Sequence, residues 1–337
     1  MYATLAAVAR HLPPGTLTNT QLAAQFPGTR AEQIHRLSGI TTRHIAAADV
    51  TPSDLAYAAA QQLFSSHPEH PREDIDALLF CSEGLDYKAP ASACLLHERL
   101  DLKRSALAMD IPGGCTGFVN GLLLAQSLIT GSSTVNNVLL LTAEAVSRVL
   151  HDDDLHLRML FGDGACATLV TRSPTRRIGE FVVGTDGSGA KTLWVERSGF
   201  REPADAQWLE MHQDTTHGMK YGRLIMQGDE LLHFALTRVP GLVRETLAVN
   251  ALALSDIDLF IFHQASKIIL NTLKRKIKIP DEKFMVCLDT HANTVSSSIP
   301  LALHEALCDG RAPSGSKVML VGFGVGLSWG ATVIDIP

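Results

Sequence analysis

The sequence of 337 residues predicts an α/β fold of layered sheets and helices, built from two duplicated halves. The main observation is a repeated segment: residues 74–82 read DIDALLFCS and residues 256–264 read DIDLFIFHQ. Each copy follows a long helical pattern and precedes a turn, a helix and a second apolar strand. Short apolar runs that alternate with helices are typical of sheets covered by helices. The same order of elements around both copies indicates a duplication rather than a local coincidence.

The elements of the two halves are predicted in matching pairs. The first half is expected to contain a helix over 53–64, the strand in 74–82, a helix over 118–130, and strands over 138–142 and 167–170. The counterparts in the second half are expected over 228–247, 256–264, 298–307, 317–322 and 331–334. Arg and Pro crowd residues 171–177, so the halves are predicted to be 1–172 and 173–337.

Composition limits the classes of function. The chain has 29 Lys and Arg against 35 Asp and Glu, a net charge of −6, so no overall positive field favours nucleic acid. No basic stretch leads into an apolar signal core, and the longest apolar helix, over 118–129, is too short to span a membrane. We therefore expect a cytoplasmic protein that binds neither nucleic acid nor membranes.

The sequence does not favour a metal or phosphate site. The six cysteines are widely spaced and form no CxxC pair, which speaks against both a zinc site and a disulfide framework. Residues 151–156 alternate histidines and acids, but such a polar run is more often a solvated loop than a metal cluster. Residues 184–192 miss the phosphate-loop pattern because Ala190 separates the glycine from Lys191. We expect no metal.

Cys115 is the candidate nucleophile. It follows an apolar strand over 106–111, lies in the glycine-rich turn GGCTG and precedes an almost wholly apolar helix. Its sulfur is expected at a buried helix N-terminus, where unpaired amides and the helix dipole favour thiolate over thiol. The flanking glycines would let a substrate carbonyl approach the backbone. A packing cysteine in a tight turn is the alternative that this segment alone leaves open.

His263 and Asn293 are the candidate partners of Cys115. They occupy the matching strand end and helix start in the second half, so a pseudo-twofold arrangement would bring them towards Cys115. A thiol, an imidazole and an amide in one cavity make a nucleophile with its helpers. Taken singly, His263 could be a core histidine and Asn293 a helix cap.

A glycine loop over residues 322–330 (GFGVGLSWG) is the fourth element of the candidate site. Its spacing differs from the dinucleotide-binding GxGxxG pattern, and it leads into a strand instead of a helix. A backbone amide that points at an oxyanion fits this loop better than a phosphate cradle.

These residues resemble the thiolase superfamily, and most closely the β-ketoacyl-acyl-carrier-protein synthase III family. The matches lie in order along nearly the whole chain: GITTRHIA (39–46), the Cys115 turn, FGDGA (161–165), MQGDE (226–230), HQA (263–265), HANT (291–294) and the final glycine loop. The resemblance implies a five-layered αβαβα fold, a homodimer and a catalytic triad of Cys115, His263 and Asn293. It also implies that acyl-coenzyme A or acyl-carrier-protein thioesters are the substrates.

The resemblance implies a decarboxylative Claisen condensation. The Cys115 thiolate would attack an acyl thioester while the amides of Cys115 and Val325 hold the oxyanion. A malonyl- or β-ketoacyl-type thioester would then supply the carbanion, with His263 and Asn293 donating to the enolate oxygen. Decarboxylation itself generates that carbanion, so no metal or redox cofactor is expected.

Departures from the family pattern indicate a specialised enzyme. Housekeeping members carry a tryptophan and an arginine that hold the adenine of coenzyme A, and this chain has Gln33 and Leu37 at those places. Specialised members of the family serve fatty-acid-related or polyketide secondary metabolism, and some cyclise their product, as in dialkylresorcinol formation. The loop over residues 83–90, with Asp86, Tyr87 and Lys88 at its centre, is the expected specificity element, because in the family it reaches the partner subunit's acyl tunnel.

Basic residues after His263 are the candidate docking surface for an acidic carrier protein. Lys267 follows the HQA motif, and Lys274, Arg275 and Lys276 lie on the next predicted helix. A local basic patch beside the site would steer an acidic partner, although a solvated helix face is the alternative.

Three other functions remain open. A type III polyketide synthase uses the same triad with a similar glycine loop but is usually longer. An acyltransferase to an oxygen or nitrogen acceptor would share the first half-reaction. A non-catalytic partner subunit would have no chemical need for Cys115, His263 and Asn293.

Overall fold

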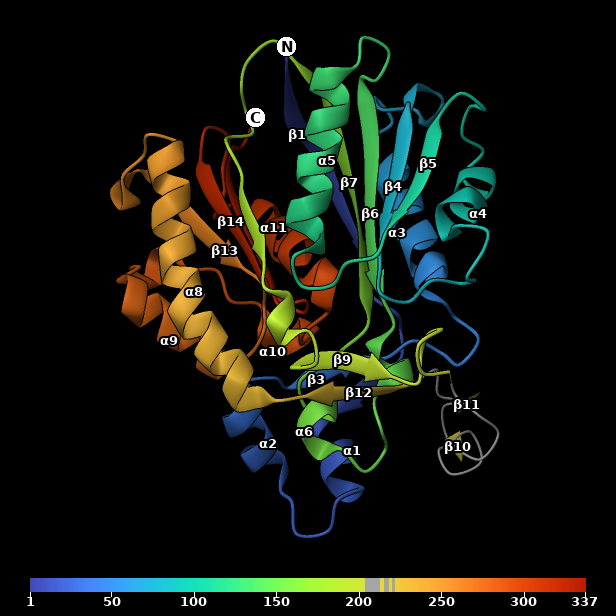
Figure 1. Cartoon of the computed structure of the whole chain (residues 1–337), viewed down its shortest axis with the longest axis vertical. Coiled ribbons are helices and arrows are strands. Elements are labelled where there is room, and N and C mark those ends of the chain that lie inside the picture. The colour runs from blue at the N-terminus through green and yellow to red at the C-terminus, as the bar shows by residue number, and fades with distance from the viewer. Residues whose placement is uncertain (204–212, 215–217, 220–221) are drawn as a thin grey trace.

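The computed structural model describes residues 1–203, 213–214, 218–219 and 222–337. Two large sheets stand side by side with helices between them and on both outer faces (Figure 1). The first sheet has the strand order β1-β7-β6-β4-β5. Its strands are β1 (Tyr2–His11), β4 (Ala77–Cys81), β5 (Leu107–Ile111), β6 (Asn137–Glu144) and β7 (Gly164–Ser173).

The second sheet has the strand order β13-β14-β15-β8. Its strands are β8 (Val182–Thr185), β13 (Leu259–Phe262), β14 (Lys317–Gly324) and β15 (Ser328–Asp335). As in the first sheet, a parallel pair is followed by an antiparallel pair: β13 runs parallel to β14, which runs antiparallel to β15. The counterparts in the first sheet are β4, β6 and β7.

The fifth strand is where the two sheets differ. In the first sheet β5 extends the parallel ladder beyond β4. At the equivalent place in the second sheet, the described residues form only an isolated parallel bridge between Phe260 and Phe284. The duplication predicted from residues 74–82 and 256–264 is therefore present, with one edge strand reduced to a single bridge.

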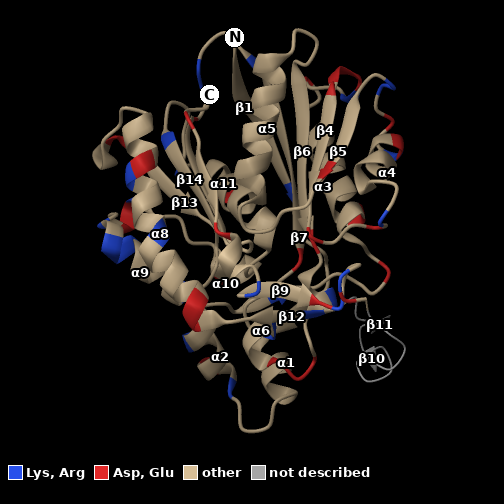
Figure 2. Ribbon diagram, viewed as in Figure 1, with Lys and Arg blue, Asp and Glu red and all other residues tan. Residues whose placement is uncertain are grey.

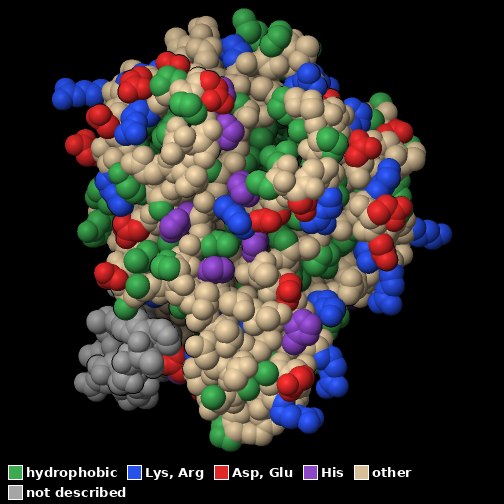
Figure 3. Space-filling model, turned by 180° about the vertical axis from the view of Figure 1, so that it is seen from behind, with side chains coloured by type: hydrophobic (Ala, Val, Ile, Leu, Met, Phe, Trp, Pro, Cys, Tyr) green, Lys and Arg blue, Asp and Glu red, His purple; other side chains and the backbone are tan. Residues whose placement is uncertain are grey.

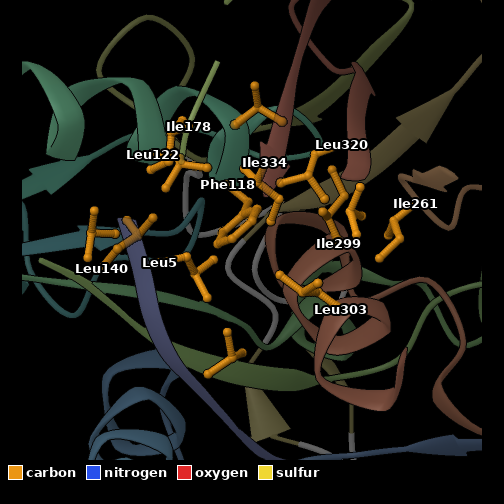
Figure 4. Close-up of a cluster of buried hydrophobic side chains, with 14 of the residues drawn as sticks. Leu5, Phe118, Leu122, Leu140, Ile178, Ile261, Ile299, Leu303, Leu320 and Ile334 are labelled. Carbon is orange, nitrogen blue, oxygen red and sulfur yellow. The ribbon is translucent and has the colours of Figure 1, made fainter. Parts of the chain in front are cut away.

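Helices α5 (Gly117–Gly131) and α11 (Ser298–Cys308) form the layer between the sheets. Their apolar side chains meet those of both sheets in one core (Figure 4). Phe118 and Leu122 of α5 and Ile299 and Leu303 of α11 are at most 1% exposed. Because α5 is almost wholly apolar, it can pack against both sheets, while Leu124 and Ser127 on its remaining side stay exposed.

Outer helices complete the five layers. Helices α3 (Pro52–Ser66) and α4 (Ser92–Arg99) cover the first sheet, and α8 (Gly228–Val249) and α9 (Lys267–Ile277) cover the second. The predicted αβαβα architecture is confirmed. Helix α3 begins one residue earlier than predicted because Thr51 and Asp54 form a capping box around Pro52 at the first helical position.

Smaller elements gather at one end of the sheets (Figure 1). They include two antiparallel pairs, β2 with β3 and β9 with β12. The elements are β2 (Thr16–Thr18), α1 (Asn19–Ala24), α2 (Ala31–Ser38), β3 (Thr42–His44), α6 (Leu155–Arg158), β9 (Leu193–Glu196), β10 (Gln213–Asp214), β11 (Gly218–Met219), β12 (Arg223–Met226) and α10 (Leu288–His291).

The chain passes from the first sheet to the second between the end of β7 at Ser173 and the start of β8 at Val182. The predicted boundary at 172/173 lies at the end of β7, and the division into two halves as separate domains stays a prediction. Across the described ranges, no helix is both long and apolar enough to cross a membrane.

Candidate active site

Cys115, His263 and Asn293 line one cavity of about 260 Å³. Cys115 lies in the turn between β5 and α5, His263 directly follows β13, and Asn293 lies between α10 and α11. The strand ends and helix starts that the duplication predicted to match are thus brought together by the two facing halves. All three side chains are at least 94% buried.

The Cys115 sulfur faces backbone amides and a glycine. Hydrogen bonds from the Val325 and Cys115 amides to the sulfur favour its thiolate. A Cβ atom added to Gly324 would lie only 2.6 Å from Cys115 Sγ, so the absence of a side chain at Gly324 makes room for the sulfur. Val325 was selected from sequence for its place in the glycine loop, and its amide does point at the sulfur.

The prediction that the local structure favours the Cys115 thiolate is wrong for the resting site. Burial raises the pKa of the Cys115 thiol to about 12, and the carboxyl groups of Glu83 and Glu144 raise the pKa further. The two amides lower the pKa by less than burial raises it. Helix α5 begins only at Gly117, so Cys115 lies outside its first turn, where the dipole acts most strongly.

His263 is held as a neutral imidazole. Its ring is 2% exposed, and burial lowers its pKa to about 3. Nδ1 lies 2.6 Å from Oγ of Ser298, at the start of α11. The same oxygen accepts a 3.3 Å hydrogen bond from the Gln264 amide, which leaves the Ser298 hydroxyl proton free to point at the imidazole.

Asn293 is fixed through both ends of its amide. Its Nδ2 donates to the Ala265 carbonyl at 3.2 Å, and its Oδ1 accepts from the Val295 amide at 2.9 Å. Ala292 and Val295, on either side of it, have φ of 59° and 51°, a region that side chains other than glycine rarely adopt. Strained backbone of this kind persists where the surrounding structure holds a functional side chain in place.

A second cavity, of about 100 Å³, meets the first at Cys115. Phe161 and Leu193 line both cavities, and β9 and β12 cover the second with Trp194, Val195 and Leu224. Its walls are mostly apolar, with Glu83 and Glu144 as the acidic exceptions. The first cavity extends past Ser266 to Ile268, which is 54% exposed. The sulfur thus lies between an apolar cavity and a passage that opens to solvent.

The predicted specificity residues lie outside both cavities of this single chain. Of their loop, only Glu83 and Gly84 line the second cavity. Tyr87 is 60% exposed, and Lys88 lies over the ring of Phe200. Asp86 is hydrogen-bonded through its amide to Ser92. Because their predicted role is in a partner subunit's tunnel, it stays a prediction.

The predicted docking residues fall into two places on α9. Lys267 is the first residue of α9, between Ser266 and Ile268 at the opening of the first cavity. Lys274, Arg275 and Lys276 lie in the last turn, and Figure 2 shows basic residues at the outer end of α9. A rise of 1.5 Å per residue puts them about 10 Å farther along the helix. Lys274 pairs with Asp281 at 2.6 Å.

Residues 151–156 have structural roles in the fold. His151 bonds Asp153 at 2.7 Å, and Asp154 caps α6 through the Leu157 amide. From behind, the molecule shows a band of histidines (Figure 3). His291 on α10 bonds Arg10, Thr290 and Glu305, so it lies apart from the Cys115 cavity. Among the described residues, no cluster of His, Cys, Asp or Glu could hold a metal ion.

Sequence reasoning missed Ser298, Glu144 and Phe161 as parts of the site, and it included Glu83 only as the first residue of the predicted specificity loop. Ser298 could have been found as the first residue of the helix after Asn293. Phe161 belongs to a segment used only for the resemblance. Glu83 and Glu144 both follow apolar strand segments at the sheet edge that carries the site, which is the signal that could have identified them.

The five-layered fold and a buried cysteine facing an imidazole and an amide define a condensing enzyme of the thiolase superfamily. Two family models match the chain: 3-oxoacyl-[acyl-carrier-protein] synthase III over residues 109–187, and the C-terminal part of the same enzyme over residues 247–336. The chain belongs to the β-ketoacyl-acyl-carrier-protein synthase III family. It is an acyltransferase of the ketosynthase type that catalyses a Claisen condensation.

Individual relatives agree with this assignment. The β-ketoacyl-[acyl-carrier-protein] synthase III of Methylococcus capsulatus is 34% identical over 334 residues, which is 99% of this chain and 98% of that protein. A crystal structure of a 3-oxoacyl-(acyl-carrier-protein) synthase III has a TM-score of 0.94 and 41% identity, with full coverage of both chains. The priming β-ketosynthase of the R1128 polyketide pathway has a TM-score of 0.88 and 26% identity, and the match covers 100% of this chain and 96% of that one.

Proposed function

We propose that this enzyme transfers an acyl group from a carrier-protein or coenzyme A thioester to Cys115 and extends it by decarboxylative condensation. The observation that carries this proposal is the shared cavity of Cys115, His263 and Asn293, beside a second, mostly apolar cavity. The apolar cavity suits the acyl chain, and the passage to Ile268 suits the pantetheine arm. No metal or redox cofactor is proposed, because decarboxylation supplies the carbanion.

In the first half-reaction, Cys115 Sγ attacks the thioester carbonyl and the pantetheine thiol leaves. The thiol proton goes to the leaving pantetheine sulfur, so the neutral His263 imidazole keeps its ring proton on Nε2 and the resting site carries no separated charges. The amides of Cys115 and Val325, which already face the sulfur, would hold the tetrahedral oxyanion.

In the second half-reaction, a malonyl-type thioester loses CO₂ and becomes an enolate. We place the ring proton of His263 on Nε2, because the Ser298 hydroxyl can donate to Nδ1. Nε2–H and the Asn293 amide are then donors for the enolate oxygen. The enolate carbon attacks the acyl-cysteine, a carbon-carbon bond forms, and Cys115 leaves as the thiolate, which takes up a proton from solvent.

We favour a carrier protein over coenzyme A as the acyl donor. Gln33 and Leu37 on α2 are both exposed and offer no guanidinium or indole ring to an adenine nucleotide. Lys267 beside the passage and the exposed Arg275 and Lys276 can attract an acidic carrier protein. The relatives' names also refer to the acyl carrier protein.

We propose that the enzyme acts as a homodimer joined at β5. This strand is an open edge of the first sheet, and its Leu107 and Met109 are 44% and 38% exposed. An apolar, unpaired strand edge is a surface that a second copy can cover. Such a dimer would bring the loop of Asp86, Tyr87 and Lys88 towards the partner's acyl cavity.

The direct test is to incubate the enzyme with acyl-carrier-protein and acyl-coenzyme A thioesters and to measure intact mass with peptide mapping. An adduct on Cys115 followed by release of CO₂ from malonyl-carrier protein is expected. Acylation without decarboxylation would favour transfer to an oxygen or nitrogen acceptor. No adduct from any donor would contradict the proposal and favour a non-catalytic subunit.

A further inference from the structure

The carboxyl group of Glu83 lies beside Cys115, yet the reaction proposed above does not use it. Glu83 follows β4 and lines the second cavity together with Cys115. A Cβ atom added to Gly114, the residue before Cys115, would lie 2.7 Å from Glu83 Oε1 and 2.7 Å from Val325 Cγ1. The carboxyl oxygen therefore lies over the Cys115 turn, close to the loop that supplies the Val325 amide.

Glu83 differs from its neighbour Glu144 in its hydrogen bonds. Glu144 accepts a 2.6 Å bond from the Ser296 hydroxyl and a 3.2 Å bond from the Glu83 amide, which explains its burial. The Glu83 carboxyl has no hydrogen-bond or ion-pair partner within the part of the chain that the structure describes. It is accessible from the cavity, so its hydrogen-bonding capacity is available to a bound molecule.

The Glu83 carboxyl accepts a hydrogen bond when ionised and can also donate one when protonated. Desolvation in the cavity raises the pKa of Glu83, and the Glu83 carboxyl in turn raises the pKa of Glu144. Two carboxyl groups at short range share a proton more easily than they both ionise. A protonated carboxyl offers one O–H donor beside its acceptor oxygen.

The rest of the second cavity offers little polarity to an acyl chain. Val146, Val149, Leu193 and Leu224 are among its lining residues, and all suit methylene groups. A chain attached to Cys115 that enters this cavity would share it with the Glu83 carboxyl and the apolar walls, and its first carbons would pass Glu83. Glu83 is exposed in the single chain, and an unsubstituted acyl chain that displaces water from its carboxyl would leave that carboxyl without a partner, which is unfavourable.

We propose that the Glu83 carboxyl hydrogen-bonds an oxygen substituent, oxo or hydroxyl, at C3 of the acyl chain on Cys115. The enzyme then selects acyl groups oxygenated at C3 over unsubstituted chains of the same length. This inference rests on the proposed function, because it assigns the substrate class of the same acyl site. Glu83 acts as a specificity residue and takes no part in the bond-forming steps.

The test compares the rate of Cys115 acylation by three pantetheine thioesters of equal length: octanoyl, 3-hydroxyoctanoyl and 3-oxooctanoyl. The readout is kcat/KM for thiol release, with intact mass to locate the adduct. The wild-type enzyme is expected to prefer the oxygenated chains by about tenfold, the value of one good hydrogen bond. Glu83→Leu should remove that preference and accept octanoyl at least as well as wild type.

Two further variants make the outcome specific. Glu83→Gln keeps a donor and an acceptor and should retain part of the preference, whereas Glu73→Gln, at an exposed site before β4, should change nothing. Wild-type enzyme that accepts octanoyl as fast as the oxygenated chains would overturn the inference, whatever the variants do. If no thioester acylates Cys115, the proposed function itself is contradicted. If all three thioesters acylate Cys115 at the same rate, only the role of Glu83 is contradicted.

Discussion

His263 Nδ1 and Ser298 Oγ lie 2.6 Å apart, across the junction between the end of β13 and the start of α11. In the proposed mechanism, this contact orients the imidazole and leaves Nε2 for the enolate oxygen. We predict that Ser298→Ala lowers the rate of malonyl decarboxylation about tenfold, the effect of losing one hydrogen bond that sets the tautomer. Ser298→Thr keeps the hydroxyl and should restore most of the rate. An unchanged rate in Ser298→Ala would show that the hydroxyl does not position His263.

Cys115→Ala should abolish acyl transfer and leave the melting temperature close to that of the wild type. Alanine is small enough for the space that Gly324 leaves and cannot form a thioester. Loss of the nucleophile should reduce turnover by about 10³-fold or more. Intact-mass measurement after incubation with acyl-carrier protein is the check, and condensation retained by Cys115→Ala would rule out the mechanism.

His263→Ala is expected to separate the two half-reactions. Acylation of Cys115 should persist at a reduced rate, whereas decarboxylation of the malonyl thioester should fall by about 10³-fold, because the enolate loses a donor. The two steps can be followed as adduct mass and as released CO₂. Equal losses in both steps would contradict this division of labour.

The depressed pKa of His263, about 3, has a consequence for stability. Below pH 6.5 the unfolded chain takes up a proton on this histidine that the folded chain does not bind. The free energy of unfolding should therefore fall as the pH drops from 6.5 towards 3, by about 1.4 kcal/mol at pH 5.5. Above pH 6.5 the effect vanishes.

A matched variant tests that pH effect. Urea unfolding of the wild type and of His263→Asn should give curves whose difference in free energy changes between pH 7 and pH 5.5, with the wild type losing more. A constant difference would show that His263 titrates normally in the folded protein.

Charge reversal at either basic place on α9 should weaken binding of the carrier protein selectively. Lys267→Glu, beside the opening of the first cavity, is expected to raise KM for acyl-carrier protein about tenfold and to leave KM for a short pantetheine thioester unchanged. The triple reversal of Lys274, Arg275 and Lys276 should have the same selectivity, because the effect acts through the carrier protein. Equal changes for both donors would indicate damage to the cavity instead of docking.

The repeated segments and the glycine-rich turns were sufficient to predict the layered architecture and the three candidate residues. Their signal is local: apolar runs specify strands, an apolar helix must be buried, and Cys115, His263 and Asn293 each follow or precede such an element. The edge strand β5 and its reduced counterpart at Phe284 could not be distinguished in this way, because pairing at a sheet edge depends on neighbours distant in sequence.

The sequence by itself determined the order of elements, the duplication and the candidate nucleophile with its two candidate partners, because residue type and periodicity carry that information. Only the tertiary structure decided the protonation of the site. Burial raises the pKa of Cys115 and lowers that of His263, against the expectation from the helix N-terminus. It also decided that Glu83 and Glu144 face Cys115, since desolvation and proximity arise only when both halves close around the sulfur.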